Sequence, residues 1–342
     1  MAVVVFGPDW GRHQPRPRTG LVLGVGGVLG AAWMTGALKS LQDRLPYALR
    51  DVDVIVGTSA GSVLAAALRC GASQEEMLSW QRGEARGTLR EAAALAAQVG
   101  PLPPLPYLRF GSVPLALAAV LTPHRVPIWV GASAFLPHGR CQHDALRSLV
   151  ETLHRRHHQR AHPGEPAPAW TCGDTWIVAV DYDTGQRVLF GQPGAPRATL
   201  TEAVVASCSI PGWFEPQVIG GRRYVDGGVR SATSLGVLSG TDLQEVYVLA
   251  PLASTEIDYP LQPHLRVERH LRQVITLSVL RQARALAAQG KRVTVLTPGP
   301  RDLAVMGINL MDPRRREAVL EASLRTCAEA LARVEQAGAR AA

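Results

Sequence analysis

Short apolar runs alternate with longer helix-like stretches along most of this chain, and glycine or proline marks the changes between them. Short runs without polar alternation predict strands that are buried on both faces. Such strands are expected at Thr19–Leu23, Asp53–Val56, Thr175–Asp181, Gln244–Ala250 and Val293–Thr297. Strands that alternate with helices are typical of an α/β fold with a mostly parallel sheet.

Helical periodicity fills much of the space between these strands, and turn residues predict two hairpins. One hairpin joins Thr175–Asp181 to Arg187–Phe190 through Asp183-Thr184-Gly185, and the other turns at Gly220-Gly221. A Ser-x-x-Glu capping box at Ser73 and Glu76 starts one helix. Helices are expected at about 31–45, 61–68, 72–98, 144–162, 200–207, 263–289 and 313–337.

Residues Leu21–Leu38 form an uncharged run that follows three arginines, as a signal peptide or a membrane span would. Five glycines are clustered mostly in its first half. A strand, a glycine turn and a buried helix explain that clustering better than one continuous apolar helix does.

The predicted organisation is one large domain with two appendages. Residues 1–18 form an N-terminal arm with one edge strand, 19–310 form the domain, and 311–342 form a C-terminal helix packed on it. Residues 75–145 are an insertion that is rich in proline and apolar runs. We expect packed helices there, and a second hypothesis makes residues 100–140 a lid or an acyl-binding surface.

Composition limits the partners and the compartment. The net charge of +8 favours anionic surfaces or substrates, but only 5% of the residues are aromatic and no basic-aromatic interleaving points to nucleic acid. The five cysteines are scattered and never in Cys-x-x-Cys spacing, which predicts reduced thiols in a cytoplasmic setting. His154, His158 and His162 have helical spacing, which allows a metal site but favours a solvated basic face or a contact with anionic lipid.

The strongest chemical signal is Gly57-Thr58-Ser59-Ala60-Gly61, between a predicted strand and an apolar helix. In that context Gly-x-Ser-x-Gly indicates a nucleophile elbow, in which the serine sits on a sharp turn beside the helix N-terminus. A hydroxyl held there can attack an ester carbonyl. The alternative is a strand–helix turn that contains a serine by chance.

A glycine loop, Gly24 to Gly30, follows the first core strand. Backbone N–H groups in such a loop can stabilise developing negative charge as an oxyanion hole. A dinucleotide fingerprint needs glycine where Leu29 stands, and the Gly-Lys-Ser/Thr of a P-loop is absent.

A serine nucleophile needs a base, and Asp226 is the candidate. It ends a predicted strand and precedes Gly227 and Gly228, which would let the backbone pack closely around it. Asp-Gly is also the strongest signal for a type I′ hairpin turn, and that interpretation competes with the catalytic one.

Four segments taken together resemble the patatin-like phospholipase family over about residues 19–235. They are Gly26-Gly27-Val28-Leu29-Gly30, Gly57-Thr58-Ser59-Ala60-Gly61, the run from Ala206 to Phe214, and Asp226-Gly227-Gly228. The resemblance implies a three-layer α/β/α fold. It also implies hydrolysis of lipid acyl esters, namely those of phospholipids, lysophospholipids or glycerides, without a cofactor or a metal.

Carried over residue by residue, the resemblance makes Ser59 the nucleophile, Asp226 the general base, and the N–H groups of Gly26 and Gly27 the oxyanion hole. Gly24, Gly30, Gly57, Gly61, Gly227 and Gly228 would support these motifs. Two positions depart from the family pattern. Val25 replaces its first glycine, which a negative φ would tolerate, and Leu29 replaces a basic residue that could contact an anionic headgroup.

Two other functions stay open at this point. One is an esterase, thioesterase or acyltransferase for a soluble acyl substrate, which chain-length preference would separate from a lipase. The other is a catalytically silent protein that associates with membranes or acts as a scaffold. A histidine-containing triad is disfavoured because His264 and His270, which follow Asp226, lie in helix-like sequence.

Overall fold

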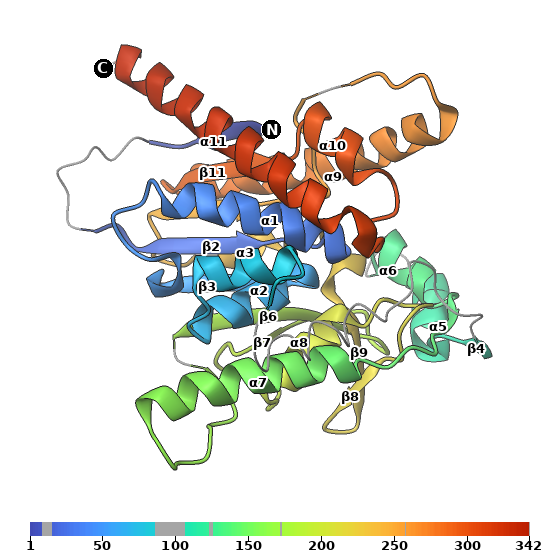
Figure 1. Cartoon of the computed structure of the whole chain (residues 1–342). Helices are drawn as coiled ribbons and strands as arrows, with labels where there is room; N and C mark the ends of the chain where they lie inside the picture. The colour runs from blue at the N-terminus through green and yellow to red at the C-terminus, as the bar shows by residue number, and fades with distance from the viewer. Residues whose placement is uncertain (9–15, 86–106, 123–125, 172, 257, 342) are drawn as a thin grey trace.

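A nine-stranded sheet crosses the centre of the molecule in a computed structural model that describes residues 1–8, 16–85, 107–122, 126–171, 173–256 and 258–341 (Figure 1). Its strand order is β1-β11-β10-β2-β3-β6-β9-β8, and β7 pairs with β6 off this path. The strands are β1 Ala2–Phe6, β2 Thr19–Leu23, β3 Val54–Thr58, β6 Asp174–Asp181, β7 Arg187–Phe190, β8 Gln217–Ile219, β9 Arg222–Asp226, β10 Glu245–Leu249 and β11 Arg292–Thr297.

The centre of this sheet is parallel and its edges are antiparallel. Strands β11, β10, β2, β3 and β6 run in the same direction, whereas β1, β7, β8 and β9 pair antiparallel with their neighbours. Leu23 pairs with Leu249 on one side and with Gly57 on the other. The carboxyl ends of β2, β3 and β10 therefore meet at one edge, the usual place for a site in such folds.

Helices cover both faces of the sheet, which confirms the predicted three-layer α/β/α architecture with a mostly parallel central sheet. The α-helices are α1 Gly27–Gln42, α2 Ala60–Arg69, α3 Gln74–Gln81, α5 Val113–Leu121, α6 Ile128–Ser133, α7 Asp144–Ala161, α8 Leu200–Cys208, α9 Pro263–Ala287, α10 Pro300–Met306 and α11 Arg316–Ala341. Short 3-10 helices are η1 Leu49–Asp51, η2 Gly227–Val229, η3 Leu235–Leu238 and η4 Pro313–Arg315.

Alternation along the buried strands divides the core between the two faces. Leu21 and Leu23 pack with α1, α2, α7, α8 and α11 on one face, and Val22 between them packs with α9 and η3 on the other. These strands read as continuous apolar runs in the sequence because both faces are covered.

The uncharged run Leu21–Leu38 is a strand, a glycine turn and a helix, as predicted. Helix α1 begins at Gly27 rather than at Ala31, because its first turn packs into the core, where Leu29 is fully buried. Tertiary packing overrides the poor helix propensity of glycine there. None of the described helices has the combination of length and hydrophobicity needed to cross a bilayer.

The insertion lies beside the strand ends, with α5 and α6 next to each other at the right of Figure 1. Leu115 and Val130 from these helices pack on Tyr182 and Val225 of the main domain. The insertion also contains a two-stranded sheet, β4 Tyr107–Phe110 with β5 Pro137–His138, which the sequence analysis missed. The helix expected over 72–98 is α3 in its first part, with the capping box formed as predicted, and residues 86–98 lie outside the described part.

Other predicted elements differ from the observed ones only in detail. The edge strand near the N-terminus is β1, both hairpins form, and the C-terminal helix is α11. Helix α10 was not predicted, because its seven residues are too short to show a clear apolar period.

Helices α1 and α11 lie across each other in Figure 1, and Gly36 of α1 lies directly against α11. A Cβ atom on Gly36 would lie 2.8 Å from the Cβ of Ser323 and 3.0 Å from the backbone nitrogen of Leu324. The Ser323 hydroxyl donates to the Trp33 carbonyl oxygen at 2.7 Å, which fixes this contact. Glycine is therefore needed here for the packing of the C-terminal helix.

We predict that Gly36→Ala lowers the midpoint of thermal unfolding. Alanine in a helix interior normally stabilises by about 1 kcal/mol, but overpacking at this contact should cost about 1–3 kcal/mol. Circular dichroism melting measures the balance. The loss should be smaller in a Ser323→Gly background, and a stabilised Gly36→Ala protein would contradict the packing argument.

Candidate active site

Ser59 occupies a strained turn between β3 and α2. Its φ of 54° and ψ of −124° lie outside the regions that an L-residue normally adopts, and the side chain is only 5% exposed. Such backbone strain is typical of the serine in a nucleophile elbow.

Close backbone packing explains the two glycines of this motif. A Cβ on Gly57 would lie 2.7 Å from the Gly61 carbonyl oxygen, and one on Gly61 would lie 2.1 Å from the Leu23 carbonyl oxygen. Helix α2 therefore starts directly against the ends of β2 and β3. Only residues without a side chain allow that approach.

Ser207 holds the strained turn from the other side. The Ser59 backbone N–H donates to the Ser207 Oγ at 2.8 Å, and the Ser207 hydroxyl donates to the Val178 carbonyl oxygen on β6 at 2.6 Å. Ser207 is fully buried at the end of α8. This supporting role was not predicted, because Ser59 and Val178 lie far from Ser207 along the chain.

Asp226 is brought to Ser59 by the sheet. Thr58 on β3 pairs with Val178 on β6, and Ala179 on β6 pairs with Asp226 at the end of β9. The Ser59 hydroxyl lies close enough to the Asp226 carboxylate to lower the pKa of that carboxyl, and the carboxylate accepts a hydrogen bond from the Gly228 N–H at 2.7 Å.

Burial raises the pKa of Asp226 from 3.8 to about 6, although the hydrogen bonds from Ser59 and Gly228 lower it. Only 4% of the side chain is exposed. A carboxyl with this pKa is mostly ionised at neutral pH and still basic enough to accept a proton.

The competing interpretation of Asp226-Gly227 as a hairpin turn is wrong. Strand β9 ends at Asp226 and continues into η2, while the hairpin in this region turns at Gly220 and Gly221 between β8 and β9. A Cβ on Gly227 would lie 2.7 Å from the Val178 carbonyl oxygen, and one on Gly228 would lie 2.8 Å from a methyl group of Val25. Both glycines let η2 pack against the strand ends.

The glycine loop after β2 is held at both ends and open in the middle. Gly24 donates to the Leu249 carbonyl oxygen at 3.0 Å, and Val25 donates to that of Ala232 at 2.9 Å. Within the described part of the chain, the N–H groups of Gly26 and Gly27 have no acceptor. Gly27, with φ of +59°, lines the same pocket as Ser59.

Three further positions of this loop have structural explanations. Val25 does not have a positive φ, so it replaces glycine without strain. Gly30 lies against Pro251, 3.2 Å from where its Cβ would stand. Leu29 is fully buried in the core and does not line the pocket.

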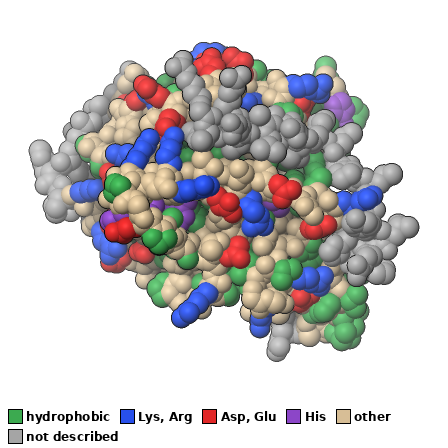
Figure 2. All heavy atoms as spheres, turned by 60° about the horizontal axis from the view of Figure 1, so that its bottom comes forward, with side chains coloured by type: hydrophobic (Ala, Val, Ile, Leu, Met, Phe, Trp, Pro, Cys, Tyr) green, Lys and Arg blue, Asp and Glu red, His purple; other side chains and the backbone are tan. Residues whose placement is uncertain are grey.

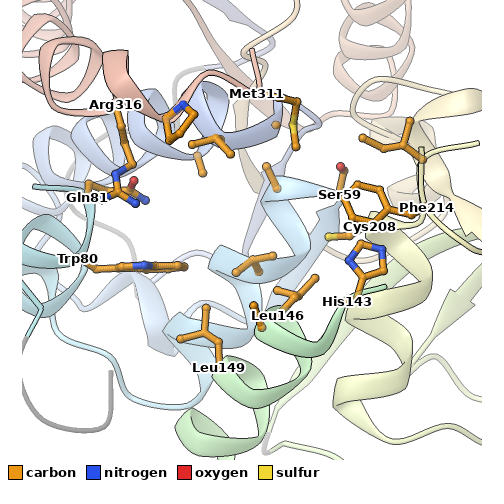
Figure 3. Close-up of a pocket in the computed structure, with 18 of the residues that line it drawn as sticks. Ser59, Trp80, Gln81, His143, Leu146, Leu149, Cys208, Phe214, Met311 and Arg316 are labelled. Carbon is orange, nitrogen blue, oxygen red and sulfur yellow. The ribbon is translucent and has the colours of Figure 1, made fainter. Parts of the chain in front are cut away.

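A cavity of about 180 Å³ opens beside Ser59 (Figure 3). Figure 3 shows Ser59, Cys208, His143 and Phe214 on one side, and Arg316, Gln81 and Trp80 on the other. The walls between them are mostly apolar and come from α1, α2, α7 and the residues before α11: Val28, Ala31, Ala60, Val63, Leu146, Leu149, Met311 and Pro313. His143, Trp80, Gln81 and Arg316 were not predicted as site residues, because no local motif marks them.

His143 is the histidine that the structure places in this cavity. Its ring stacks on Phe214 with centroids 4.0 Å apart, and its Nε2 atom is buried without a partner among the described residues. Burial, with a smaller effect of Arg147, lowers the pKa of His143 to about 4, so the imidazole is neutral. A neutral ring here can exchange a hydrogen bond with a bound ligand.

Other groups singled out in the sequence lie in different surroundings. His264 and His270 belong to α9, on the opposite face of the sheet. His158 stacks on His162 with ring centroids 5.0 Å apart, whereas His154 is buried.

No described group of three metal-ligating side chains is close enough to hold an ion. No disulfide joins the described cysteines, which are Cys70, Cys141, Cys208 and Cys327. Burial raises the pKa of Cys208 beside the cavity.

A serine on a strained strand–helix turn at the end of a parallel sheet is typical of serine hydrolases. The sequence matches the family model described as patatin-like phospholipase over residues 21–238, which is well over half of the chain. The chain belongs to the patatin-like phospholipase family, which confirms the resemblance inferred from its motifs.

Similar solved structures include VipD and ExoU. VipD from Legionella pneumophila has a TM-score of 0.43 and 11% identity, with 92% of this chain and 67% of that chain covered. The type III effector ExoU has a TM-score of 0.28 and 18% identity, with 98% and 64% covered. The ExoU–SpcU complex of Pseudomonas aeruginosa has a TM-score of 0.34, 16% identity, and 94% and 60% covered. The chain thus spans about two thirds of the length of these structures or less.

We predict that Asp226→Asn stabilises the fold at neutral pH. Between pH 3.8 and about 6 the unfolded chain loses this proton before the folded one does, so the ionised carboxylate lowers stability as pH rises. Above pH 6 the whole loss of folding free energy caused by ionised Asp226 remains, on the order of 2–3 kcal/mol. The thermal midpoint of the variant should exceed that of the wild type at pH 7.5, and the gap should close towards pH 4.

Asp183→Asn is the matched control for this experiment. A hydrogen bond from Arg223 lowers the pKa of Asp183, so its ionised form stabilises the fold above its unfolded pKa. This variant should lose stability at pH 7.5. A loss in Asp226→Asn as well would contradict the burial argument.

Proposed function

We propose that this protein is a serine hydrolase of lipid acyl esters that works through a Ser59–Asp226 dyad and an acyl-enzyme. The observation that carries the proposal is the interaction of the Ser59 hydroxyl with the buried Asp226 carboxylate, whose pKa it lowers, next to an apolar cavity. Family membership supports the same chemistry, since it points to hydrolysis of lipid esters.

In the first half-reaction Asp226 accepts the hydroxyl proton while Ser59 Oγ attacks the ester carbonyl. The free N–H groups of Gly26 and Gly27 are suited to stabilise the oxyanion that develops. Asp226 then returns the proton to the leaving alcohol, and the acyl group stays on Ser59. In the second half, Asp226 takes a proton from water, water attacks the acyl carbon, and Ser59 is regenerated with its proton.

Cys208 and His143 have no proton-transfer role in this scheme. Burial raises the pKa of the Cys208 thiol, which disfavours the thiolate needed for attack. The Ser59 hydroxyl acts directly on the pKa of Asp226, which supports a dyad without a histidine between the two residues. His143 is better placed to orient the bound ester or the departing alcohol.

Fluorophosphonate labelling followed by intact-mass measurement is the first test. We predict one adduct on the wild type and none on Ser59→Ala, with labelling of Asp226→Asn slowed by about 10²–10⁴. The exposed Ser278→Ala on α9 should label normally. His143→Ala should still give the adduct, with a much smaller loss of rate than Asp226→Asn, because His143 only orients the ligand. Labelling that required His143 would overturn the dyad, and an unlabelled wild type would favour the silent scaffold.

The pH dependence of kcat/KM for a soluble ester tests the base. Activity requires ionised Asp226, so kcat/KM should fall about tenfold per pH unit below about pH 6 and level off above it. A profile that kept rising past pH 8 would point to a different base.

An apolar face beside the cavity supports a lipid surface as the place of action. Seven large apolar side chains of α5, α6 and the following turn are more than half exposed: Val113, Leu117, Val120, Leu121, Ile128, Trp129 and Phe135. Neither Val113–Leu121 nor Ile128–Phe135 contains a charged residue. Large exposed apolar areas of this kind mark interaction sites.

This α5–α6 face is joined to the cavity by a short stretch of chain. Leu136 lies against Gly212, and the N–H groups of Arg140 and Cys141 donate to the Trp213 carbonyl oxygen. Phe214 comes next and lines the cavity. In Figure 2, charges of both signs are interspersed, and the largest group of hydrophobic side chains lies at the lower right, the side on which Figure 1 has α5 and α6. The net charge of +8 also favours anionic lipid.

We predict that Leu117→Ser/Trp129→Ser weakens binding to vesicles of phosphatidylglycerol and phosphatidylcholine by at least tenfold, because each buried large side chain contributes about 1.5–3 kcal/mol. Vesicle co-sedimentation measures this, and hydrolysis of a soluble short-chain ester should be unchanged. Leu277→Ser on α9, which also exposes apolar side chains, is the matched control. Loss of binding in the control alone would assign the surface to α9. Equal binding by all variants would favour a soluble acyl substrate.

A further inference from the structure

We propose that Arg316, with Gln81, forms an anion subsite at the end of the cavity opposite Ser59. This inference rests on the proposed function, because it concerns which esters the Ser59 site accepts. Figure 3 shows Arg316 and Gln81 together, across the cavity from Ser59. The side chains between the two ends are mostly apolar.

Arg316 differs from the two arginines that precede it. Arg314 forms hydrogen bonds of 2.8 and 2.9 Å with the Asp312 carboxylate, and Arg315 donates to the Val305 carbonyl oxygen at 3.2 Å. Arg316 turns into the cavity instead, and in the described residues it has neither an ion pair nor a hydrogen bond. Its guanidinium is thus available to a ligand.

The surroundings of Arg316 favour an anion from outside the protein. Burial lowers its pKa, and no described carboxylate opposes that effect. A half-buried guanidinium without a counterion has lost hydration that nothing in the cavity replaces. An oxyanion bound by two parallel N–H donors would replace it, and arginine matches phosphate and carboxylate in this way.

Gln81 adds neutral hydrogen-bonding capacity at the same place. It is 3% exposed at the end of α3, and its amide donates to the Thr35 hydroxyl at 3.4 Å. Among the described side chains that line the cavity, Arg316 alone carries a permanent positive charge, since His143 is neutral. Leu29 offers no charge and lies in the core.

The ligand that fits this polarity is an amphiphilic ester. Its carbonyl reaches Ser59, an apolar segment lies along the cavity wall, and an oxyanion reaches Arg316. The oxyanion is either the phosphate of a phospholipid headgroup or a carboxylate at the far end of the acyl chain. Both sources share the same recognition chemistry at the guanidinium.

Two pairs of soluble substrates separate these sources. Dihexanoyl phosphatidic acid and dihexanoylglycerol differ in the phosphate, whereas the 4-nitrophenyl monoester of adipic acid and 4-nitrophenyl hexanoate differ in the distal carboxylate. We predict that Arg316→Gln lowers kcat/KM for the anionic member of one pair by at least tenfold and leaves both neutral members within twofold. The pair that responds identifies the source.

Arg315→Gln is the matched control, because it removes the same charge from an exposed neighbouring position outside the cavity. It should change neither pair. Arg316→Lys keeps the charge but loses the two-donor geometry, so it should fall between wild type and Arg316→Gln. An equal loss for anionic and neutral esters, or no loss for either anionic ester, would overturn the subsite.

A binding measurement separates this inference from the proposed function. Calorimetry with hexyl phosphate and hexanol needs no turnover, and the phosphate should bind the wild type at least tenfold more tightly than the alcohol. That preference should vanish in Arg316→Gln and persist in Ser59→Ala. If Arg316→Gln kept the preference for hexyl phosphate, the subsite proposal would be wrong even if Ser59 were active. If the wild type hydrolysed no ester but preferred hexyl phosphate, the proposed function would be wrong and the subsite would still be supported.

Discussion

The strained backbone at Ser59 is the constraint on which the rest of the site depends. A φ of 54° at a non-glycine residue persists only where the surroundings fix it from several sides. Gly57 and Gly61 let α2 press against β2 and β3, and Ser207 ties the Ser59 amide to β6. The helical layer and the parallel strands therefore hold the hydroxyl at one point at the edge of the sheet.

The buried carboxylate shows how stability and chemistry oppose each other here. Asp226 lies where water is excluded, which raises its pKa to about 6 and makes its ionised form unfavourable for folding. The same burial makes it a better proton acceptor for a hydroxyl that hydrogen-bonds to it. Gly227 and Gly228 allow η2 to close over this group, so the unfavourable charge is held by packing on all sides.

The cavity has two different ends, with Ser59 at one and Arg316 at the other. Apolar residues from α1, α2 and α7 form its walls, His143 stands near Ser59, and Arg316 stands at the other end. The insertion adds an uncharged surface whose chain runs along Gly212–Phe214 to the cavity. Three elements far apart in sequence thus meet around one cavity: the insertion, the main sheet and the start of the C-terminal helix.

Local chemistry made the sheet and the elbow predictable from sequence. Apolar runs such as Thr19–Leu23 and the Gly57–Gly61 motif each carry their own signal, because burial on two faces and close backbone approach restrict residue type locally. Asp226 could be nominated but not distinguished from a turn residue, since its partner is set by the β3–β6–β9 ladder. His143, Gln81 and Arg316 have no local signal at all. Their role as cavity walls arises only when α3, α7 and α11 pack on the same face of the sheet, and that long-range packing is what tertiary structure alone decided.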